Sequence, residues 1–194
     1  MSQFFLNRYR TKSCRLSGWD YSKNGEYFVT ICTNNQENLF GEIQNKKIKL
    51  SRIGKIVEKF WKEIPKHFPF VKLDQFMMMP SHLHGILIIN NTSVGTPRPR
   101  PVGTPQWGVP TKNIKKQIRK SNHKPEWKPN SLGSIINQFK SVCTKKIRKE
   151  YPWIGTVWQS RFYDRVIRNK SEFNHIQNYI LSNPENWEND AKNI

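Results

Sequence analysis

Apolar and polar positions follow two different periods along the chain, and these periods predict separate strands and helices. The first predicted strand covers residues 27–33, which are rich in β-branched and aromatic side chains and are followed by Asn34 and Asn35. Residues 39–43 and 46–50 flank a short polar turn. They predict a hairpin that follows the first strand.

A helix is predicted directly after this hairpin, with Ser51 as its N-cap. Its apolar residues form one stripe of a 3.6-residue repeat: Ile53, Ile56, Val57, Phe60, Trp61 and Ile64. Pro65 and Pro69 are expected to stop it. Two strands are predicted next, at 71–79 and 82–90, and the second is apolar along most of its length, as is typical of a central strand.

The pattern breaks between residues 91 and 130. This stretch holds 7 of the 12 prolines and nine basic residues against one acidic residue, Glu126. A segment of this length and composition cannot bury a core, so we expect a flexible, basic, proline-rich insertion.

Order resumes with an apolar helical stripe over residues 131–147, and lysines and arginines fill many of the positions between. Residues 158–167 predict another strand. Ser171 is expected to cap a last helix that runs to Asn183 and ends at Pro184. This order of elements predicts an α+β fold, in which helices pack on a mainly antiparallel sheet.

The net charge of the chain limits the classes of function that it can have. Lys and Arg number 33 and Asp and Glu 14, which gives a net charge of +19 over 194 residues. The hydrophobic fraction of 36% suffices for one packed core, which excludes a wholly disordered basic tail. We therefore expect a basic arm (1–26) and one domain (27–90 and 131–186) that carries the insertion (91–130). Because such an excess of charge repels itself, a polyanion, by default nucleic acid, is the expected partner.

Other protein classes are not favoured by the sequence. No apolar run approaches the roughly 18–20 residues that span a bilayer. The N-terminal sequence lacks the apolar centre and the small-residue cleavage site of a signal peptide. We expect an intracellular protein without a membrane partner.

The sharpest candidate for chemistry is the sequence His82-Leu83-His84 on a predicted strand. Strand side chains alternate between faces, so both imidazoles point to one side and Leu83 to the other. Two imidazoles can share one divalent metal, but a third ligand must then come from another element. A hydrogen-bonded histidine pair without a metal is the alternative.

The last predicted helix offers that third ligand. Tyr179 and Asn183 lie one turn apart on one helical face. If this face meets the histidines, Asn183 completes a metal site and Tyr179 stands beside it as a nucleophile. A tyrosine hydroxyl has a pKa near 10, so its phosphate target must be polarised, as a divalent ion can do. Ordinary packing is the alternative role for this tyrosine.

These motifs resemble those of a known family. Residues 78–85, Met-Met-Pro-Ser-His-Leu-His-Gly, resemble the HUH motif (His, hydrophobic residue, His) of the IS200/IS605-like transposases. Residues 178–184, Asn-Tyr-Ile-Leu-Ser-Asn-Pro, resemble the Tyr-Ile-x-x-Asn-Pro signature of the REP-associated tyrosine transposase branch. Segments 27–43 and 158–168 also match, so the resemblance covers nearly everything except the insertion.

The resemblance implies a ferredoxin-like α+β fold, that of an HUH endonuclease with a single tyrosine (Y1). It implies that His82, His84 and Asn183 bind Mg²⁺ or Mn²⁺, although insertion-sequence members commonly have Gln in place of Asn183. Tyr179 would cleave single-stranded DNA, leaving a 5′-phosphotyrosine link and a free 3′-OH for rejoining. The implied substrate is a hairpin-forming single strand in the bacterial cytoplasm, at the nucleoid. A monomer is favoured over a dimer.

Basic side chains in the domain and its arm are the expected contacts to DNA phosphates, which supply affinity rather than sequence readout. The candidates in the domain are Lys140, Lys145, Lys146, Arg148, Lys149, Arg161, Arg165 and Arg168. In the arm they are Arg8, Arg10, Lys12 and Arg15. Trp107 and Trp127 in the insertion are candidates for stacking on unpaired bases.

Two other functions stay open beside the transposase. One is a domesticated relative that binds structured single strands without transposing, and the other is a metal phosphoesterase in which His82 and His84 activate water. The complete set of histidines and Tyr179 favours the transposase over both. Gly85 either leaves room for substrate or a neighbouring helix, or permits tight packing in the sheet.

Overall fold

The computed structural model describes residues 4–5, 8–9, 15–16, 18–91 and 128–187. The strands are Phe4–Phe5 (β1), Arg8–Tyr9 (β2), Gly25–Cys32 (β3), Gly41–Gln44 (β4), Lys47–Leu50 (β5), Val71–Met78 (β6), His82–Ile89 (β7) and Tyr163–Ile167 (β8). The helices are Arg52–Lys62 (α1), Ile64–His67 (α2), Leu132–Glu150 (α3) and Lys170–Ser182 (α4), with 3₁₀ turns at Asn34–Gln36 (η1) and Asn183–Asn186 (η3). None of these helices is both long and apolar enough to cross a membrane. Most of the predicted insertion, including Trp107 and Trp127, lies outside the described residues, as does most of the arm.

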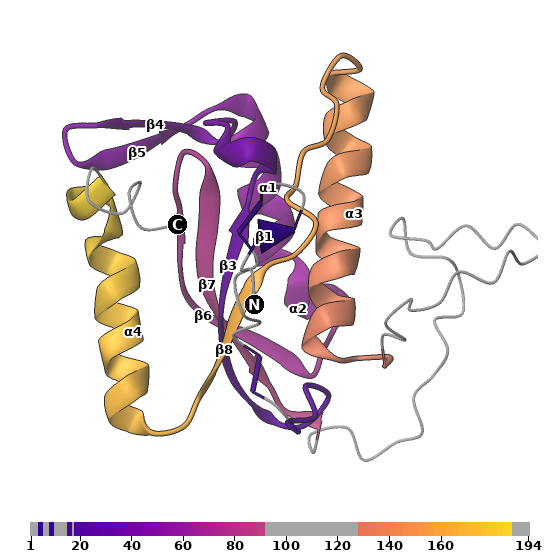
Figure 1. Cartoon of the computed structure of the whole chain (residues 1–194), viewed down its shortest axis with the longest axis vertical. Coiled ribbons are helices and arrows are strands. Elements are labelled where there is room, and N and C mark those ends of the chain that lie inside the picture. Colours follow the sequence, from indigo (N-terminus) through magenta and orange to yellow (C-terminus); the bar gives the residue numbers. More distant parts are fainter. Residues whose placement is uncertain (1–3, 6–7, 10–14, 17, 92–127, 188–194) are drawn as a thin grey trace, which may run out of the picture.

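A four-stranded sheet with the order β6-β7-β3-β8 forms the centre of the fold (Figure 1). Every neighbouring pair is antiparallel, which confirms the predicted α+β class with an antiparallel sheet. Strand β7 is buried along nearly its whole length, as its apolar sequence predicts for a central strand. In this register His84 on β7 lies opposite Thr30 on β3 and Met77 on β6.

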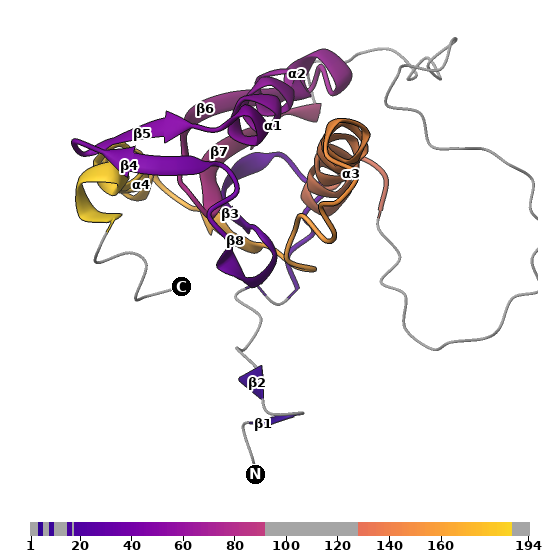
Figure 2. The ribbon, with the colours of Figure 1, turned by 90° about the horizontal axis from the view of Figure 1, so that it is seen from above.

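The two faces of the sheet are covered by different helices (Figure 2). Helices α1 and α3 pack on one face, where Ile31 and Leu83 join the larger hydrophobic core. Helix α4 packs on the other face, where a smaller cluster contains Phe28 and Ile86. Because strand side chains alternate, His82 and His84 share the face of Ile86 and therefore point toward α4.

Three predicted boundaries differ from the structure in detail. Helix α1 ends at Lys62, ahead of Pro65 as expected, but Pro65 then lies in the first turn of the short helix α2, where a missing N–H is tolerated, and α2 ends before Pro69. The last helix is capped by Asn169, whose side chain accepts a hydrogen bond from the backbone of Glu172, and not by Ser171. Strand β8 begins at Tyr163, and the preceding residues make only an isolated bridge at Trp158.

Gly85 leaves room for a neighbouring helix, which is one of its predicted roles. A Cβ atom at this position would collide with the indole ring of Trp61, which α1 inserts against β7. Trp61 is fully buried, so the ring has no free space into which to move. The glycine therefore lies on the face of β7 that packs in the core, and the histidines lie on the other face.

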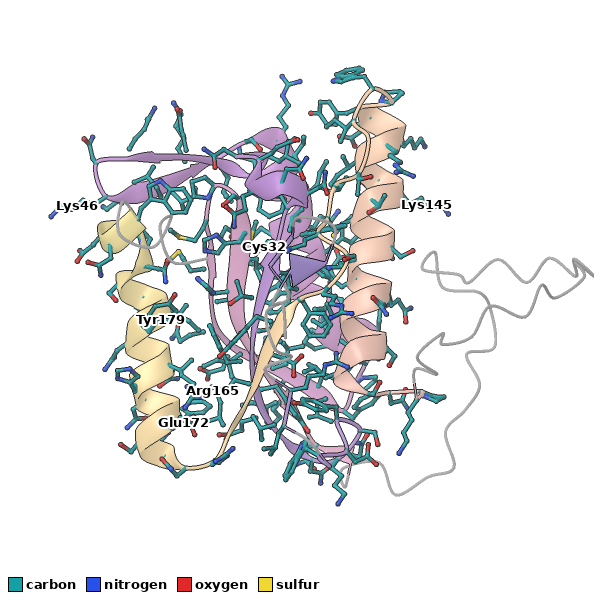
Figure 3. All side chains as sticks on the ribbon, viewed as in Figure 1. Cys32, Lys46, Lys145, Arg165, Glu172 and Tyr179 are labelled. Carbon is teal, nitrogen blue, oxygen red and sulfur yellow. The ribbon has the colours of Figure 1, made fainter. Side chains whose placement is uncertain are left out.

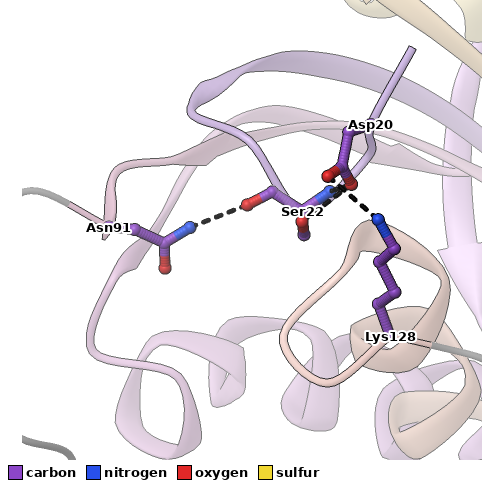
Figure 4. Close-up of polar contacts among 4 residues, drawn as sticks. All are labelled: Asp20, Ser22, Asn91 and Lys128. Carbon is purple, nitrogen blue, oxygen red and sulfur yellow. Dashed lines mark hydrogen bonds and ion pairs between the residues drawn. The ribbon is translucent and has the colours of Figure 1, made fainter. Parts of the chain in front are cut away.

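The two described residues that flank segment 92–127 are tied to one turn of the chain (Figure 4). The Asn91 side chain donates to the carbonyl of Ser22 over 2.9 Å. Lys128 pairs with Asp20 over 3.1 Å, and hydrogen bonds from Ser22 and Lys128 lower the pKa of that carboxyl to about 2. The chain thus leaves the domain and re-enters it at the same place.

Candidate active site

Two buried imidazoles form the centre of the site. His82 and His84 are 1% and 2% exposed, and their Nε2 atoms lie 3.0 Å apart. The sequence predicted that both rings would point to one side of the strand, and the structure places them so. Their separation suits a shared proton, and it also suits two adjacent ligands of one ion, since ligands at about 2.1 Å and at right angles lie about 3 Å apart.

Each of these rings is held by a hydroxyl at its other nitrogen. Thr30 Oγ1 lies 2.8 Å from Nδ1 of His84, and Ser81 Oγ lies 3.3 Å from Nδ1 of His82. An Nδ1 atom that donates to a hydroxyl leaves Nε2 as the unprotonated, metal-binding nitrogen. The two hydroxyls therefore hold the orientation in which both Nε2 atoms face the centre of the site.

Helix α4 brings Tyr179 to the histidines, as the sequence predicted. The phenolic oxygen lies 3.5 Å from Nε2 of His84, and the two ring centroids are 5.3 Å apart. The helix is fixed in this position by Phe173, Ile176 and Ile180, which are buried against the sheet. Tyr179 itself is 38% exposed and projects from the side of α4 that faces the sheet (Figure 3), so a substrate can reach it.

Asn183 lies at the end of α4 and is 2% exposed. Its Oδ1 atom is buried and has no hydrogen-bond partner among the described residues. It is four residues beyond Tyr179, which contacts His84, and four residues before Trp187, whose ring centroid is 5.8 Å from that of His82. Asn183 is thus bracketed along the chain by two residues that touch the histidines.

Trp187 is a part of the site that the sequence reasoning missed. Its ring makes a tilted contact with that of His82, at 32° between the ring planes. The spacing of positions 179, 183 and 187 could not indicate this contact, because α4 ends at Ser182 and a 3₁₀ turn over Asn183–Asn186 precedes Trp187.

These donors fit a divalent cation. Two neutral imidazoles and one amide oxygen are accepted ligand types for first-row divalent ions, and a buried amide oxygen without a protein partner can be satisfied by an ion or by water. Within the described residues no cluster of three His, Cys, Asp or Glu could hold a metal, so the candidate set depends on Asn183. A set of this kind carries no charge and leaves the charge of an ion available to a phosphate.

The structure corrects one predicted DNA contact. Lys140 is only 8% exposed, and its ammonium donates to the carbonyls of Gln159 over 2.7 Å and Arg161 over 3.0 Å. Burial lowers its pKa to about 8. Lys140 lies between Ile136 and Cys143 on the apolar stripe of α3. Its position in the helical repeat therefore indicates that it is buried.

The other predicted phosphate contacts in the domain are exposed but lie in two places. Helix α3 carries Lys145, Lys146, Arg148 and Lys149, and it lies across the sheet from α4 and Tyr179, as Lys145 and Tyr179 show in Figure 3. Arg161, Arg165 and Arg168 are on or beside β8. Arg165 faces α4, where it pairs with Glu172 over 2.6 Å. The structure therefore brings only the second group to the edge of the site.

Comparison with known proteins identifies one sequence relative and one structural neighbour of interest. A Haemophilus influenzae protein, described as uncharacterized, is 35% identical over 179 residues, which are 92% of this chain and 91% of that protein. A solved structure of a REP-associated tyrosine transposase bound to a REP hairpin superimposes with a TM-score of 0.51 at 16% identity, covering 93% of this chain and 73% of the other. No protein-family model matches the chain.

Proposed function

The chain belongs to one family with the Haemophilus influenzae protein and has the fold of the IS200/IS605-like Y1 transposases, and from this premise we propose that it is a single-stranded DNA nickase and strand transferase. The observation that carries the proposal is the approach of the Tyr179 hydroxyl to the buried His82–His84 pair. The histidines, the tyrosine and Asn183 together make a site for phosphoryl transfer.

Tyr179 is the nucleophile of this mechanism. Its oxygen attacks the phosphorus of a phosphodiester, a bond forms between them, and the P–O3′ bond breaks. The phenolic proton passes to solvent, which reaches the partly exposed side chain, and the departing 3′ oxygen takes up a proton. The products are a 5′-phosphotyrosine and a free 3′-OH. The reverse attack by a 3′-OH rejoins DNA and restores the tyrosine, so no nucleotide cofactor is needed.

His82, His84 and Asn183 are the residues that would hold a divalent ion, for which we propose Mg²⁺ or Mn²⁺. When bound, the ion supplies polarisation of a non-bridging phosphate oxygen. The protein's own part is to hold the imidazoles in one orientation, through Thr30 and Ser81, and to place the tyrosine at their edge.

The proposed substrate is a hairpin-bearing DNA single strand at the bacterial nucleoid. The net charge of +19 supports a polyanionic partner, and the structural neighbour is bound to a REP hairpin. We propose that the protein acts as a monomer.

Adduct formation tests this proposal. The protein is incubated with a labelled hairpin-bearing single strand and Mg²⁺ or Mn²⁺, and the products are separated on a denaturing gel. Wild type gives a covalent protein–DNA adduct, Tyr179→Phe gives none, and Tyr151→Phe, which loses a hydroxyl on the other side of the sheet, behaves as wild type. Cleavage that survives in Tyr179→Phe indicates a phosphoesterase that uses water. Binding without cleavage in wild type indicates a DNA-binding protein.

A further inference from the structure

Strand β8 presents an exposed aromatic ring on the same face of the sheet as the histidines. Its exposure alternates, with Tyr163 and Arg165 exposed and Asp164 and Val166 buried. Arg165 reaches Glu172 on α4, which fixes the α4 side of the sheet as the face of both exposed residues. Tyr163 is 41% exposed, and β8 is an outer strand that pairs only with β3 in the described sheet.

A short series of ring contacts connects Tyr163 to the proposed nucleophile. The Tyr163 ring lies edge-on to Phe28, with centroids 6.1 Å apart. Phe28 in turn stacks on His84 at 5.5 Å and meets Tyr179 edge-on at 6.1 Å. Phe28 is buried, whereas the tyrosines on either side of it are exposed. The two tyrosine rings are thus within about 12 Å, twice the single contact distance, which a very short stretch of extended single strand can span.

The surroundings of this ring suit nucleic acid. Outer strands usually carry charged side chains, so a large exposed ring on one calls for an explanation. Arg161 is exposed two residues before Tyr163, and Arg165 is exposed two residues after it. An aromatic face flanked by cationic side chains is the arrangement by which proteins hold unpaired bases together with their phosphates.

We propose that Tyr163 is a base-stacking subsite that holds an unpaired base close to the phosphodiester attacked by Tyr179. Arg161 and Arg165 contact the backbone of the same nucleotides. This inference rests on the proposed function, because it takes the substrate to be a single strand laid across β3 and β8 beside the histidines. The subsite positions the strand, and Tyr163 takes no part in bond making or breaking.

The test measures binding separately from cleavage. All variants are made in the Tyr179→Phe chain, and affinity for labelled single strands is measured by fluorescence anisotropy without added metal. In the series of strands an abasic site is moved along the sequence one position at a time. Tyr163→Ala is expected to weaken binding of the intact strand by about 5- to 150-fold, which is the usual effect of losing one stacked base. Tyr163→Phe keeps the ring and is expected to keep the affinity.

The position of the abasic site gives the decisive result. When the abasic site is at one particular position, the chain that keeps Tyr163 should bind the strand more weakly by the same factor of about 5- to 150-fold. Tyr163→Ala should cause no further loss of affinity for that abasic strand, because the ring and the base form one coupled pair. Trp153→Ala is the matched control. This indole is 78% exposed, but it lies in the connection after α3 and is linked by ring contact only to Tyr151 among the described residues.

Several outcomes overturn the proposal. Unchanged affinity in Tyr163→Ala, an equal loss at every abasic position, or an equal loss in Trp153→Ala each excludes a specific subsite. A loss shared by Tyr163→Phe, or a lowered melting temperature in Tyr163→Ala, assigns the effect to folding and overturns the stacking role. If the position-specific loss appears but wild type forms no adduct, the subsite stands and the nickase fails.

Discussion

The hydroxyl oxygen of Thr30 on β3 lies 2.8 Å from Nδ1 of His84 on β7, and both side chains are buried. The two residues are directly opposite in the register of the strands. The contact holds the rotation of the imidazole, so Nε2 is left facing His82 and Tyr179.

Thr30→Val should therefore weaken metal binding. Valine keeps the shape of threonine and removes the hydroxyl, and loss of such a partner typically lowers metal affinity about 10- to 100-fold. Thr30→Ser retains the hydroxyl and should bind Mn²⁺ like wild type. Calorimetric titration with Mn²⁺ measures this directly, and equal affinity in wild type and Thr30→Val would contradict a positioning role.

Asn183→Ala should lower Mn²⁺ affinity more than it lowers folding stability. The buried Oδ1 has no hydrogen-bond partner among the described residues, so its removal breaks no such bond in the metal-free chain. Calorimetry with Mn²⁺ and thermal melts in EDTA separate the two quantities. His175→Ala is the control, since it removes an exposed histidine from the same helix. An unchanged titration in Asn183→Ala would remove it from the ligand set.

The lowered pKa of Lys140 predicts that the folding stability of the protein depends on pH. The unfolded chain keeps this proton up to the usual pKa of 10.5, whereas burial in the folded chain lowers the pKa to about 8. Folding releases the proton between these values, so this group's contribution to the free energy of unfolding rises with pH from about 8 to 10.5. Below a pH of about 8, the buried lysine is protonated and destabilises the folded chain by its full amount.

Denaturant titrations of wild type and Lys140→Met at several pH values measure this dependence. The stability of wild type relative to the variant should increase as the pH passes through the window, because methionine does not titrate. Lys145→Met, on the exposed side of α3, should show no such trend. A constant difference between wild type and Lys140→Met would mean that the lysine titrates normally.

Gly85→Ala should destabilise the fold by about 1–3 kcal/mol, the usual effect of overpacking a core. The added methyl group meets the buried ring of Trp61. Urea unfolding measures the loss, and combining Gly85→Ala with Trp61→Leu should recover part of it. Full stability in Gly85→Ala would show that α1 moves away from β7 without penalty.

Replacing segment 92–127 with a short Gly-Ser linker should preserve both fold and adduct formation. The residues on either side, Asn91 and Lys128, are held by the same turn at Asp20 and Ser22, so a short linker suffices. Melting temperature and the adduct assay check the two properties. Loss of both would show that the segment belongs to the catalytic domain.

The sequence predicted the strands and helices of the domain, because the apolar periods of β7, α1 and α3 reflect which face each element buries. It also predicted that Tyr179 would meet the histidines, although the chemical roles of these residues stay predictions. Thr30 could not be found, because its role depends on the strand register. The predicted DNA contact at Lys140 was wrong, because the place of this residue on the apolar stripe of α3 buries it although it is basic.

The predicted ends of helices differ from the structure where one residue type is acceptable at two different positions in the chain. Pro65 ends one helix pattern and is also acceptable in the first turn of the next, and the sequence alone does not distinguish these. Asn169 and Ser171 are both good caps, and the choice depends on where β8 releases the chain.

Helix α4 carries the proposed nucleophile but belongs to the smaller of the two hydrophobic clusters. We therefore expect α4 to open more readily than the core beneath α1 and α3. The amides of α4 should exchange with deuterium faster than those of α3. Such exchange would mean that the element carrying Tyr179 can open while the histidine face stays folded, which would give a bound strand a way to leave.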